Sequence, residues 1–222
     1  MRYLPLAGVV LLVVITGCLR PWLQLRRHGT FGILMFRSGR WAQHARDALL
    51  VALFALLIGQ GMGVASQRHV LRLLVAEHSP THAGLQAGGA VLLFGGIALL
   101  AVAQLNMGAS WRVGIKEGDA PGLVSGGLYR FCRHPIYLGL LTAIAGYTAM
   151  LLTPLSLALL ASAYGGARTQ AAAEEAYLIR TYGEAYRAYA RRTGRFVPGV
   201  GVRPSGTDTM APLQGPSPPT VV

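Results

Sequence analysis

Two clusters of polar residues interrupt an otherwise apolar chain and carry most of the side chains that could do chemistry. The first, residues 123–137, contains Arg133 and His134 just before a long apolar run. The second follows the next apolar pair and begins with the adjacent carboxylates of Glu174 and Glu175. Charged groups beside membrane-like segments are costly to hold unless they bind something. We therefore interpret the two clusters as the halves of one site.

The Arg133-His134-Pro135 triplet suits the binding of an anion. Proline disfavours helix at the preceding His134 and presets the first turn of a helix that follows. Backbone amides at such a helix start, with Arg133 beside them, would bind an anionic group such as a cofactor carboxylate. The alternative is that Arg133 and His134 only anchor the following helix at a membrane interface.

The carboxylates of Glu174 and Glu175 suit a cation or a diol. Neighbouring side chains on a helix point about 100° apart, so at most one of the two faces the site squarely. Such a carboxylate could bind a ribose diol, a cofactor ammonium or a sulfonium charge. The alternative is a solvated helix face with Arg180 nearby.

Metal and disulfide sites are not supported by the spacing of His and Cys. His78 and His82 are four residues apart, but Pro80 between them and the lack of a third ligand favour an ordinary loop. Cys18 lies in an apolar run and Cys132 beside charged residues, so we expect no disulfide. Residues 15–18 loosely resemble a lipoprotein processing site. We favour a membrane helix there, because processing would place the following arginines outside.

Composition indicates an integral membrane protein. The 222 residues are 53% hydrophobic and only 13% charged, with a mean hydropathy of +0.45. The formal net charge of +12 could suggest nucleic acid. However, the arginines lie in loops between apolar runs, which favours a membrane surface and membrane lipids as partners, and no nucleic acid.

The apolar pattern predicts an all-α, polytopic membrane helical bundle of about five transmembrane helices. A Thr153-Pro154 break predicts a tight helical hairpin over residues 136–165, and the last helix should extend into the cytosol as residues 171–192. We expect one domain over residues 1–201, with its cofactor-binding part at 106–200, and a disordered tail at 202–222. The expected apolar segments are residues 3–19, 48–65, 84–105, 136–152 and 155–165.

Glycine pairs spaced four apart predict where these helices approach each other closely. Gly59 and Gly63 form one such pair, and Gly84 and Gly88 form another. Small residues at this spacing allow close helix packing in membranes.

The distribution of basic residues predicts the orientation. With five spans, 17 basic residues fall on one side of the membrane and three on the other. The positive-inside rule then places the N-terminus outside, and the C-terminus and both polar clusters in the cytosol. Lys116 is the only lysine, a bias that favours a GC-rich prokaryotic genome and hence the inner (cytoplasmic) membrane.

Five short motifs in order carry a family resemblance. Together they cover about residues 105 to 200, and their order and spacing are specific as a set. In this combination the chain resembles the isoprenylcysteine carboxyl methyltransferase family, whose wider group includes phospholipid N-methyltransferases. The motifs are Gly122-Leu123-Val124-Ser125-Gly126-Gly127-Leu128-Tyr129, Arg133-His134-Pro135-Ile136-Tyr137-Leu138-Gly139, Glu174-Glu175, Tyr182-Gly183-Glu184-Ala185-Tyr186 and Arg195-Phe196-Val197-Pro198.

The resemblance implies a membrane enzyme that uses S-adenosyl-L-methionine. The cofactor would bind between the last cytosolic loop and the C-terminal helices. A lipid-tailed or prenylated acceptor would enter sideways from the inner leaflet. By position, the cofactor-binding residues would be Gly122, Leu123, Val124, Tyr129, Arg133, His134, Pro135, Ile136, Tyr137, Glu174 and Glu175.

One departure from the family pattern concerns the acceptor. The family has an arginine, thought to orient the acceptor, one helical turn before the glutamate that corresponds to Glu174. Here that position holds Gln170, and the nearest arginine is Arg168. Glu174, Gln170 and Arg168 are therefore the candidate catalytic residues, and a carboxylate acceptor would be harder to hold without its arginine.

The resemblance leaves several reactions open. In-line displacement at a sulfonium methyl needs mainly positioning and desolvation. A prenylcysteine carboxylate needs no base, whereas a phospholipid amine would need deprotonation by Glu174 or Glu175. An NADPH-dependent sterol-type reductase shares the Arg-His-Pro region, and a non-catalytic membrane protein could keep the shape alone. The oligomeric state is not predicted.

Overall fold

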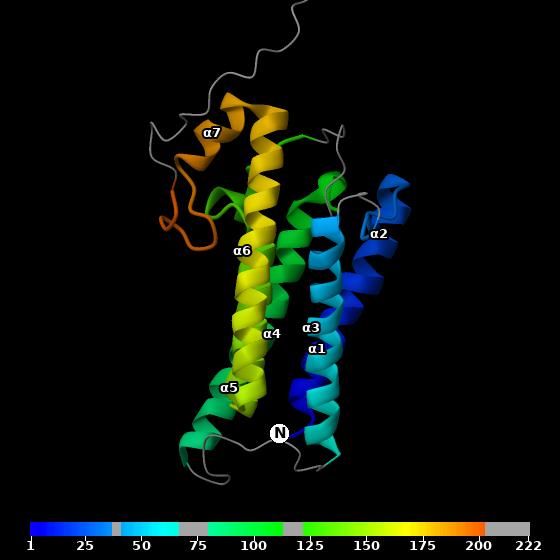
Figure 1. Ribbon diagram of the computed structural model, residues 1–222, viewed down its shortest axis with the longest axis vertical. Coiled ribbons are helices and arrows are strands. Elements are labelled where there is room, and N and C mark those ends of the chain that lie inside the picture. Colours follow the sequence, from blue (N-terminus) through cyan, green and yellow to red (C-terminus); the bar gives the residue numbers. More distant parts are fainter. Residues whose placement is uncertain (37–40, 67–79, 113–121, 203–222) are drawn as a thin grey trace, which may run out of the picture.

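The computed structural model describes residues 1–36, 41–66, 80–112 and 122–202. Within these ranges the named elements are all helical, and an isolated bridge joins Cys132 and Gly194. Figure 1 shows the arrangement of the helices. The elements, in order, are α1 (Leu4–Val13), η1 (Val14–Leu19), α2 (Arg20–His28), α3 (Trp41–Ala65), α4 (Pro80–Asn106), η2 (Gly108–Ser110), η3 (Gly127–Arg130), α5 (Pro135–Leu151), α6 (Pro154–Tyr182) and α7 (Glu184–Ala190).

Three helices in the described ranges are long and apolar enough to cross a membrane. The first is the continuous stretch Leu4–His28, which joins α1, η1 and α2, and the others are α3 and α4. They have 25, 25 and 27 residues, close to the roughly 20 that a bilayer core requires. Helix α5 is apolar but shorter, and α6 begins apolar and ends polar. The expectation of an all-helical membrane bundle is confirmed.

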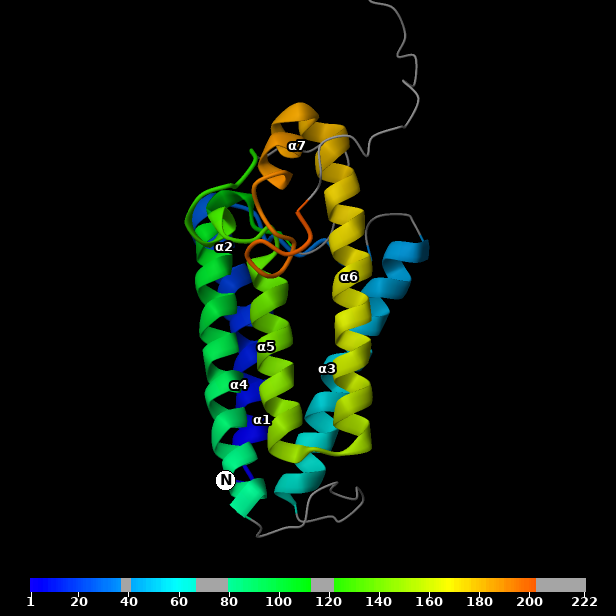
Figure 2. The ribbon, with the colours of Figure 1, turned by 90° about the vertical axis from the view of Figure 1, so that its left-hand side faces the viewer.

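The helices run along one long axis and place both polar clusters at the same end. Figure 1 shows the N-terminus at the bottom and α7 at the opposite end of the molecule. In Figure 2 the start of α5 and the end of α6 lie at that upper end, close to α7. The two halves of the expected site are therefore brought together by the fold.

Two helix starts differ from the expectation. Helix α3 begins at Trp41 rather than at residue 48, because a helix can continue past the bilayer core through polar residues such as Gln43. Helix α4 begins at Pro80, so that His82 lies in its first turn and not in a loop. Proline is tolerated at the first helical position, where its missing N–H costs nothing. His78 lies outside the described residues.

Helices α4 and α5 pack against each other through glycines. A Cβ atom added to Gly96 would lie 2.4 Å from the backbone nitrogen of Ala143, and one added to Gly146 would lie 2.3 Å from that of Leu93. No real Cβ atom tolerates these distances. Only glycine therefore lets the two helix backbones come so close.

The glycine pairs expected from the sequence are not the ones used. Nothing lies within 4 Å of a Cβ built on Gly59, Gly63, Gly84 or Gly88, so the prediction of close packing at these positions is wrong. The contact instead uses Gly89, whose Cβ would lie 2.7 Å from the carbonyl oxygen of Gly146. Since one residue turns a helix by about 100°, a register shift of one moves the packing face away from the expected glycines.

The turn between α5 and α6 is fixed by side chains. Leu152 ends α5 in the left-handed region with φ of 38°. Thr153 and Ser156 then form a reciprocal capping box, in which the Ser156 N–H donates to Thr153 Oγ1 at 3.0 Å. Gln60 Nε2 of α3 donates to the same hydroxyl at 2.6 Å. The expected hairpin and its break are thus confirmed.

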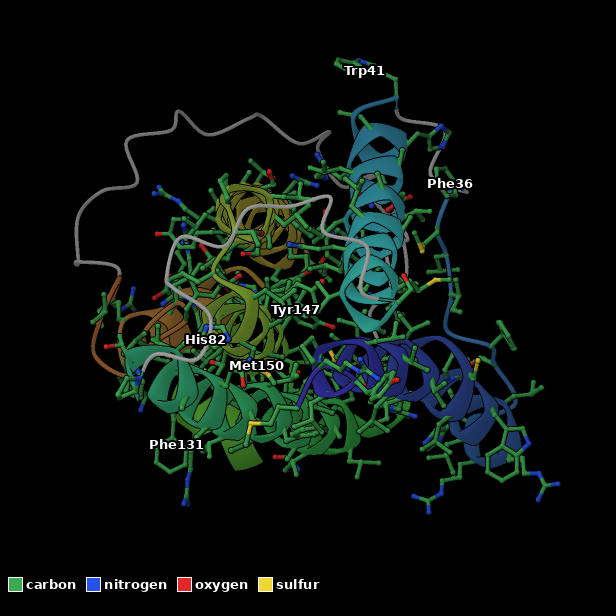
Figure 3. The ribbon with its side chains drawn as sticks, turned by 90° about the horizontal axis from the view of Figure 1, so that it is seen from below. Phe36, Trp41, His82, Phe131, Tyr147 and Met150 are labelled. Atoms are coloured by element: carbon green, nitrogen blue, oxygen red, sulfur yellow. The ribbon has the colours of Figure 1, made fainter. Side chains whose placement is uncertain are left out.

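The core lies where α1, α3, α4, α5 and the start of α6 meet. Tyr147 and Met150 of α5 are almost fully buried, and Figure 3 shows both in the middle of the bundle. The Tyr147 hydroxyl donates to the carbonyl of Leu57 at 2.8 Å, so the one polar atom of this ring is satisfied. Trp41, in contrast, extends from the start of α3 away from the bundle (Figure 3).

Candidate active site

The site begins at the start of α5. His134 precedes the helix with φ of −130° and ψ of 61°, outside helical geometry, and Pro135 occupies the first position of the helix. This is the local conformation that a proline imposes on the residue before it. The His134 ring is 5% exposed and stacks between Tyr137 and Phe196, with centroid distances of 5.7 and 6.0 Å.

Glu174 and Glu175 have different environments. The Glu175 side chain is fully buried, and its Oε1 accepts from Arg133 Nε and Arg195 Nε, both at 3.0 Å. The Glu174 side chain is 29% exposed. Its Oε1 accepts from the Tyr137 hydroxyl at 2.6 Å and from Gln170 Nε2 at 3.0 Å. Only Glu174 is therefore accessible to a ligand.

His134 connects the two carboxylates. Its Nδ1 lies 3.6 Å from Glu174 Oε2 and its Nε2 lies 3.4 Å from Glu175 Oε1. Burial disfavours the charged imidazolium, but the hydrogen bonds and negative charges of Glu174 and Glu175 outweigh it, so the pKa of His134 is raised above its ordinary value. Since both ring nitrogens face carboxylates, the protonated ring can donate to each of them.

Arg133 ties the C-terminal segment to α6. Besides Glu175, its guanidinium donates to the carbonyl oxygens of Ala190 at 3.0 Å, of Gly201 at 2.9 Å and of Thr193. The side chain is 1% exposed. All three guanidinium nitrogens thus have protein acceptors, which favours a role in holding the wall of the site over direct contact with a cofactor carboxylate.

A short backbone pairing completes this wall. The Arg133 N–H donates to the Gly194 carbonyl at 2.8 Å, and the His134 N–H donates to the Arg195 carbonyl at 3.0 Å. A Cβ on Gly194 would lie 2.0 Å from the carbonyl oxygen of Val197, so the turn that follows requires glycine. This turn places the Arg195 side chain beside Glu175. Arg195 was not among the expected site residues.

The loop before α5 is held by Asn106 at the end of α4. Its Oδ1 accepts from the Leu128 N–H at 2.8 Å, and a Cβ on Gly127, whose φ is 58°, would lie 2.2 Å from the same oxygen. Tyr129 follows and is buried, and its carbonyl accepts from the Tyr189 hydroxyl at 2.6 Å. Burial, followed by the charge of Glu174, raises the pKa of the Tyr129 phenol well above its ordinary value, so the phenol stays protonated.

The expected residues Gly122, Leu123 and Val124 form the outer edge of this loop. The Gly122 N–H donates to the hydroxyl of Tyr182 at 3.1 Å, which ties the loop to the end of α6. Leu123 lines a pocket of about 390 Å³ between the loop and α7. Its complete lining is Leu123, Ser125, Arg130, Ala185, Tyr189, Arg192 and Thr193. The lining carries two arginines and no carboxylate, while Glu174 and His134 do not line this pocket.

The side chains of Gln170 and Arg168, both on α6, have different surroundings. Gln170 lies one helical turn before Glu174 and donates to its carboxylate. Arg168 is exposed and lies over the ring of Tyr164, 5.9 Å from its centroid. The side-chain oxygen of Gln170, Oε1, accepts from Nε of Arg46, in α3, at 2.8 Å.

Sequence reasoning missed three contributors to the site. Asn106 and Arg46 come from helices whose sequences showed no sign of a site, and Arg46 counted only as one more basic residue near the membrane. Arg195 stood in the last of the five quoted motifs, so its place in that motif was a usable signal. The remaining expected residues, Ile136 included, lie at the start of α5 or on α6 as predicted.

The geometry gives one accessible carboxylate on a rigid support. Glu174 is held by a phenol, an amide and the imidazole of His134, while the pair of arginines around Glu175 fixes the backbone behind it. Such a carboxylate can bind a cation or a diol without first reorganising. Within the described residues, no group of three His, Cys, Asp or Glu side chains is placed to hold a metal ion.

Residues 89–180 match the family model of the isoprenylcysteine carboxyl methyltransferase (ICMT) family. The match includes the loop before α5, His134, Glu174 and Glu175. The protein-S-isoprenylcysteine O-methyltransferase of Rattus norvegicus is 33% identical over 124 residues, and that of Mus musculus is 32% identical over 124 residues. Each alignment covers 53% of this chain and 44% of the relative, so the chain spans under half the length of these relatives.

A solved structure has a similar fold. It is a eukaryotic intramembrane Ras methyltransferase, ICMT, which matches with a TM-score of 0.54 and 19% sequence identity over 82% of this chain and 61% of that one. The expected resemblance to the isoprenylcysteine carboxyl methyltransferase family is therefore confirmed. Together with the three long apolar helices, the shared helical fold identifies the chain as an integral membrane protein.

Proposed function

We propose that this chain, whose residues 89–180 carry the pattern of isoprenylcysteine carboxyl methyltransferases, transfers a methyl group from S-adenosyl-L-methionine to a lipid-tailed carboxylate. The observation that carries the proposal is the accessible carboxylate of Glu174, held by His134 and Tyr137 inside the matched segment. A membrane protein with no such carboxylate would have no fixed partner for a cationic cofactor. The prenylated acceptor would share the bilayer with the enzyme.

The residues fit the chemical groups of the cofactor. Glu174 would bind a positive or hydroxyl group, and the pocket lined by Arg130 and Arg192 suits a carboxylate. The segments 122–124 and 135–137, with Tyr129, would line the cofactor between them. Arg133 and Glu175 would support this wall from behind rather than contact the cofactor.

The reaction asks the protein for positioning more than for proton transfer. S-adenosyl-L-methionine supplies an activated methyl group on a sulfonium. A carboxylate nucleophile needs no general base, so the role of His134 would be to keep Glu174 in place. Burial of Tyr129 and of the His134 ring excludes water from this side of the site, which strengthens every charge interaction there.

The cellular setting follows from the same proposal. Residues 1–201 would act as one unit, with the site facing the cytosol and the N-terminus outside. The excess of arginine near the site end of the bundle supports this orientation. The preference for arginine over lysine supports a prokaryotic inner membrane. A lipid-tailed acceptor would then reach the site sideways from the inner leaflet.

Cofactor binding tests the first half of the proposal. Detergent-purified protein should bind S-adenosyl-L-methionine and should not bind NADPH in isothermal calorimetry. Glu174→Gln should weaken binding at least about tenfold, the size expected for losing one charge-assisted contact. Glu184→Gln is the matched control, because Glu184 is 66% exposed on α7 and pairs with the half-buried Arg187 and Arg191, away from Glu174. Preference for NADPH would favour a reductase instead.

Methyl transfer tests the second half. Vesicles containing the protein are supplied with cofactor carrying a labelled methyl group and either a farnesylated cysteine or phosphatidylethanolamine. A methyl ester releases labelled methanol on mild alkaline treatment, whereas an N-methyl group does not. Alkali-labile label on the prenylated cysteine is the expected result. Stable label on the phospholipid would assign the protein to amine methylation, and cofactor binding without transfer to any lipid would indicate a non-catalytic relative.

A further inference from the structure

Arg46 is a cation placed at the edge of the candidate site by a helix that the family motifs do not include. It lies near the start of α3 and is half-buried. Its Nε donates to Gln170 Oε1 at 2.8 Å, and its Nη2 donates to Gln43 Oε1 at 2.7 Å. Figure 2 shows the start of α3 on the side of α6 that faces away from α4.

Among the described residues, no carboxylate neutralises the charge of Arg46. Across the described ranges of the chain, its guanidinium forms no ion pair, and both of its hydrogen-bond partners are neutral amides. The adjacent carboxylate of Asp47 is engaged elsewhere, because it accepts from Gln43 Nε2 and from the Phe36 N–H, both at 2.8 Å. A half-buried guanidinium whose hydrogen-bond partners are neutral keeps its positive charge available to an anionic ligand.

Gln170 connects this cation to the reacting region. Its oxygen accepts from Arg46 while its Nε2 donates to Glu174 Oε1 at 3.0 Å. The amide thus keeps Arg46 and Glu174 on either side of it without letting them form an ion pair. The accessible carboxylate and the free cation stay available to two different ligands.

We propose that Arg46 binds the carboxylate of the methyl acceptor and so selects an anionic acceptor over an amine. This inference rests on the function proposed above. A guanidinium can hold a carboxylate through two parallel N–H bonds, and it repels the ammonium form of a phospholipid amine. Gln170 is the positioning residue that orients Arg46 relative to Glu174.

The charge change in the reaction fits this assignment. A carboxylate oxygen forms a bond to the methyl carbon, the carbon–sulfur bond breaks with its electron pair remaining on sulfur, and no proton moves. The acceptor therefore loses its negative charge in the step. Arg46 binds the substrate as an ion pair but binds the neutral ester weakly, which favours release of the product.

The test compares ligands that differ only in charge. A farnesylated cysteine with a free carboxylate and its carboxamide compete for binding to the detergent-purified protein, a measurement that needs no turnover. The wild-type protein should prefer the carboxylate by about 10- to 100-fold, the range of a charge-assisted bidentate contact. Arg46→Gln should abolish this preference, Arg46→Lys should retain part of it, and the affinity for S-adenosyl-L-methionine should remain unchanged.

Two further variants separate a specific role from a structural one. Arg168→Gln removes an exposed arginine of α6 that lies over the ring of Tyr164, and it should leave the preference intact. The double variant Arg46→Gln/Gln170→Arg moves the cation from α3 to α6 and should restore part of the preference. In turnover, Arg46→Gln should raise the KM for the prenylated carboxylate about tenfold or more, with a smaller effect on kcat.

The outcomes distinguish this inference from the proposed function. Equal affinity of the wild-type protein for carboxylate and carboxamide, or an unchanged preference in Arg46→Gln, would overturn the role of Arg46 while methyl transfer stands. Absence of cofactor binding in the wild-type protein would instead remove the proposed function. Should Arg46→Gln fail to fold, as judged by loss of cofactor binding, the Arg46→Lys and double variants decide the question.

Discussion

His134 Nδ1 lies 3.6 Å from Glu174 Oε2, and the other nitrogen of the same ring faces Glu175. One imidazole thus serves two carboxylates that are neighbours in sequence but differ in exposure. The accessible Glu174 is oriented by a group that is itself fixed by the buried Glu175. Any change in the protonation of His134 must therefore reach both carboxylates.

The first prediction concerns pH. The pKa of His134 in the folded protein lies above the ordinary value of 6.5. The contribution of protonated His134 to the stability of the fold is therefore complete below about pH 6.5 and is lost as the pH rises through the raised pKa. The temperature of half-unfolding in detergent should decrease as the pH is raised from about 6 to about 9 in the wild-type protein. It should decrease less in His134→Gln. Parallel pH profiles for the two proteins would contradict this.

The second prediction concerns the buried carboxylate. Glu175→Gln leaves Arg133 and Arg195 without their shared negative partner in a fully buried position. Removing one partner of a buried ion pair costs about 3–5 kcal/mol, so the free energy of unfolding should fall by that amount. Glu184→Gln, at an exposed pair, should change it little. Chemical unfolding followed by tryptophan fluorescence measures both, and equal effects would argue against the assigned roles.

The third prediction concerns the contact between α4 and α5. Gly146→Ala places a Cβ 2.3 Å from the backbone nitrogen of Leu93, so the helices must separate, at a cost of about 1–3 kcal/mol. Gly88→Ala adds the same atom where nothing lies within 4 Å and should be neutral or slightly stabilising. Thermal unfolding of the two variants compares them directly. A larger loss for Gly88→Ala would mean that the packing faces are assigned incorrectly.

The fourth prediction concerns the hairpin turn. Thr153→Ala removes the hydroxyl that accepts from the Ser156 N–H and from Gln60. Loss of a helix cap costs about 1 kcal/mol, and the stranded Gln60 amide adds to it. Thr153→Ser keeps the hydroxyl and serves as the control. Similar unfolding midpoints for the Ala and Ser variants would show that the cap contributes little.

The sequence predicted the helices, and the meeting of the two polar clusters, for a physical reason. Long apolar runs leave few structures other than helices, and the Pro135 and Pro154 positions fix where two of them begin. The chain order of His134 and Glu174 was enough to predict that they meet. These features are local or follow from hydropathy alone.

Contacts between distant helices could not be predicted in the same way. Which glycine faces a neighbour depends on helix rotation, so the spacing of Gly84 and Gly88 could not show that Gly89 is the residue that faces α5. Arg46 and Gln170 are separated by 124 positions, and no spacing rule connects them. The expected last helix is divided at Gly183, which ends α6 with φ of 53° before α7 begins.

The clamp formed by Arg133 has a consequence for the order of assembly during synthesis. Its carbonyl acceptors at Ala190, Thr193 and Gly201 are made well after the membrane helices. A chain still held by the ribosome can insert α1 to α6 into the bilayer before its C-terminal segment packs against the two polar clusters. We therefore expect the wall of the candidate site to form late in folding, after the membrane helices.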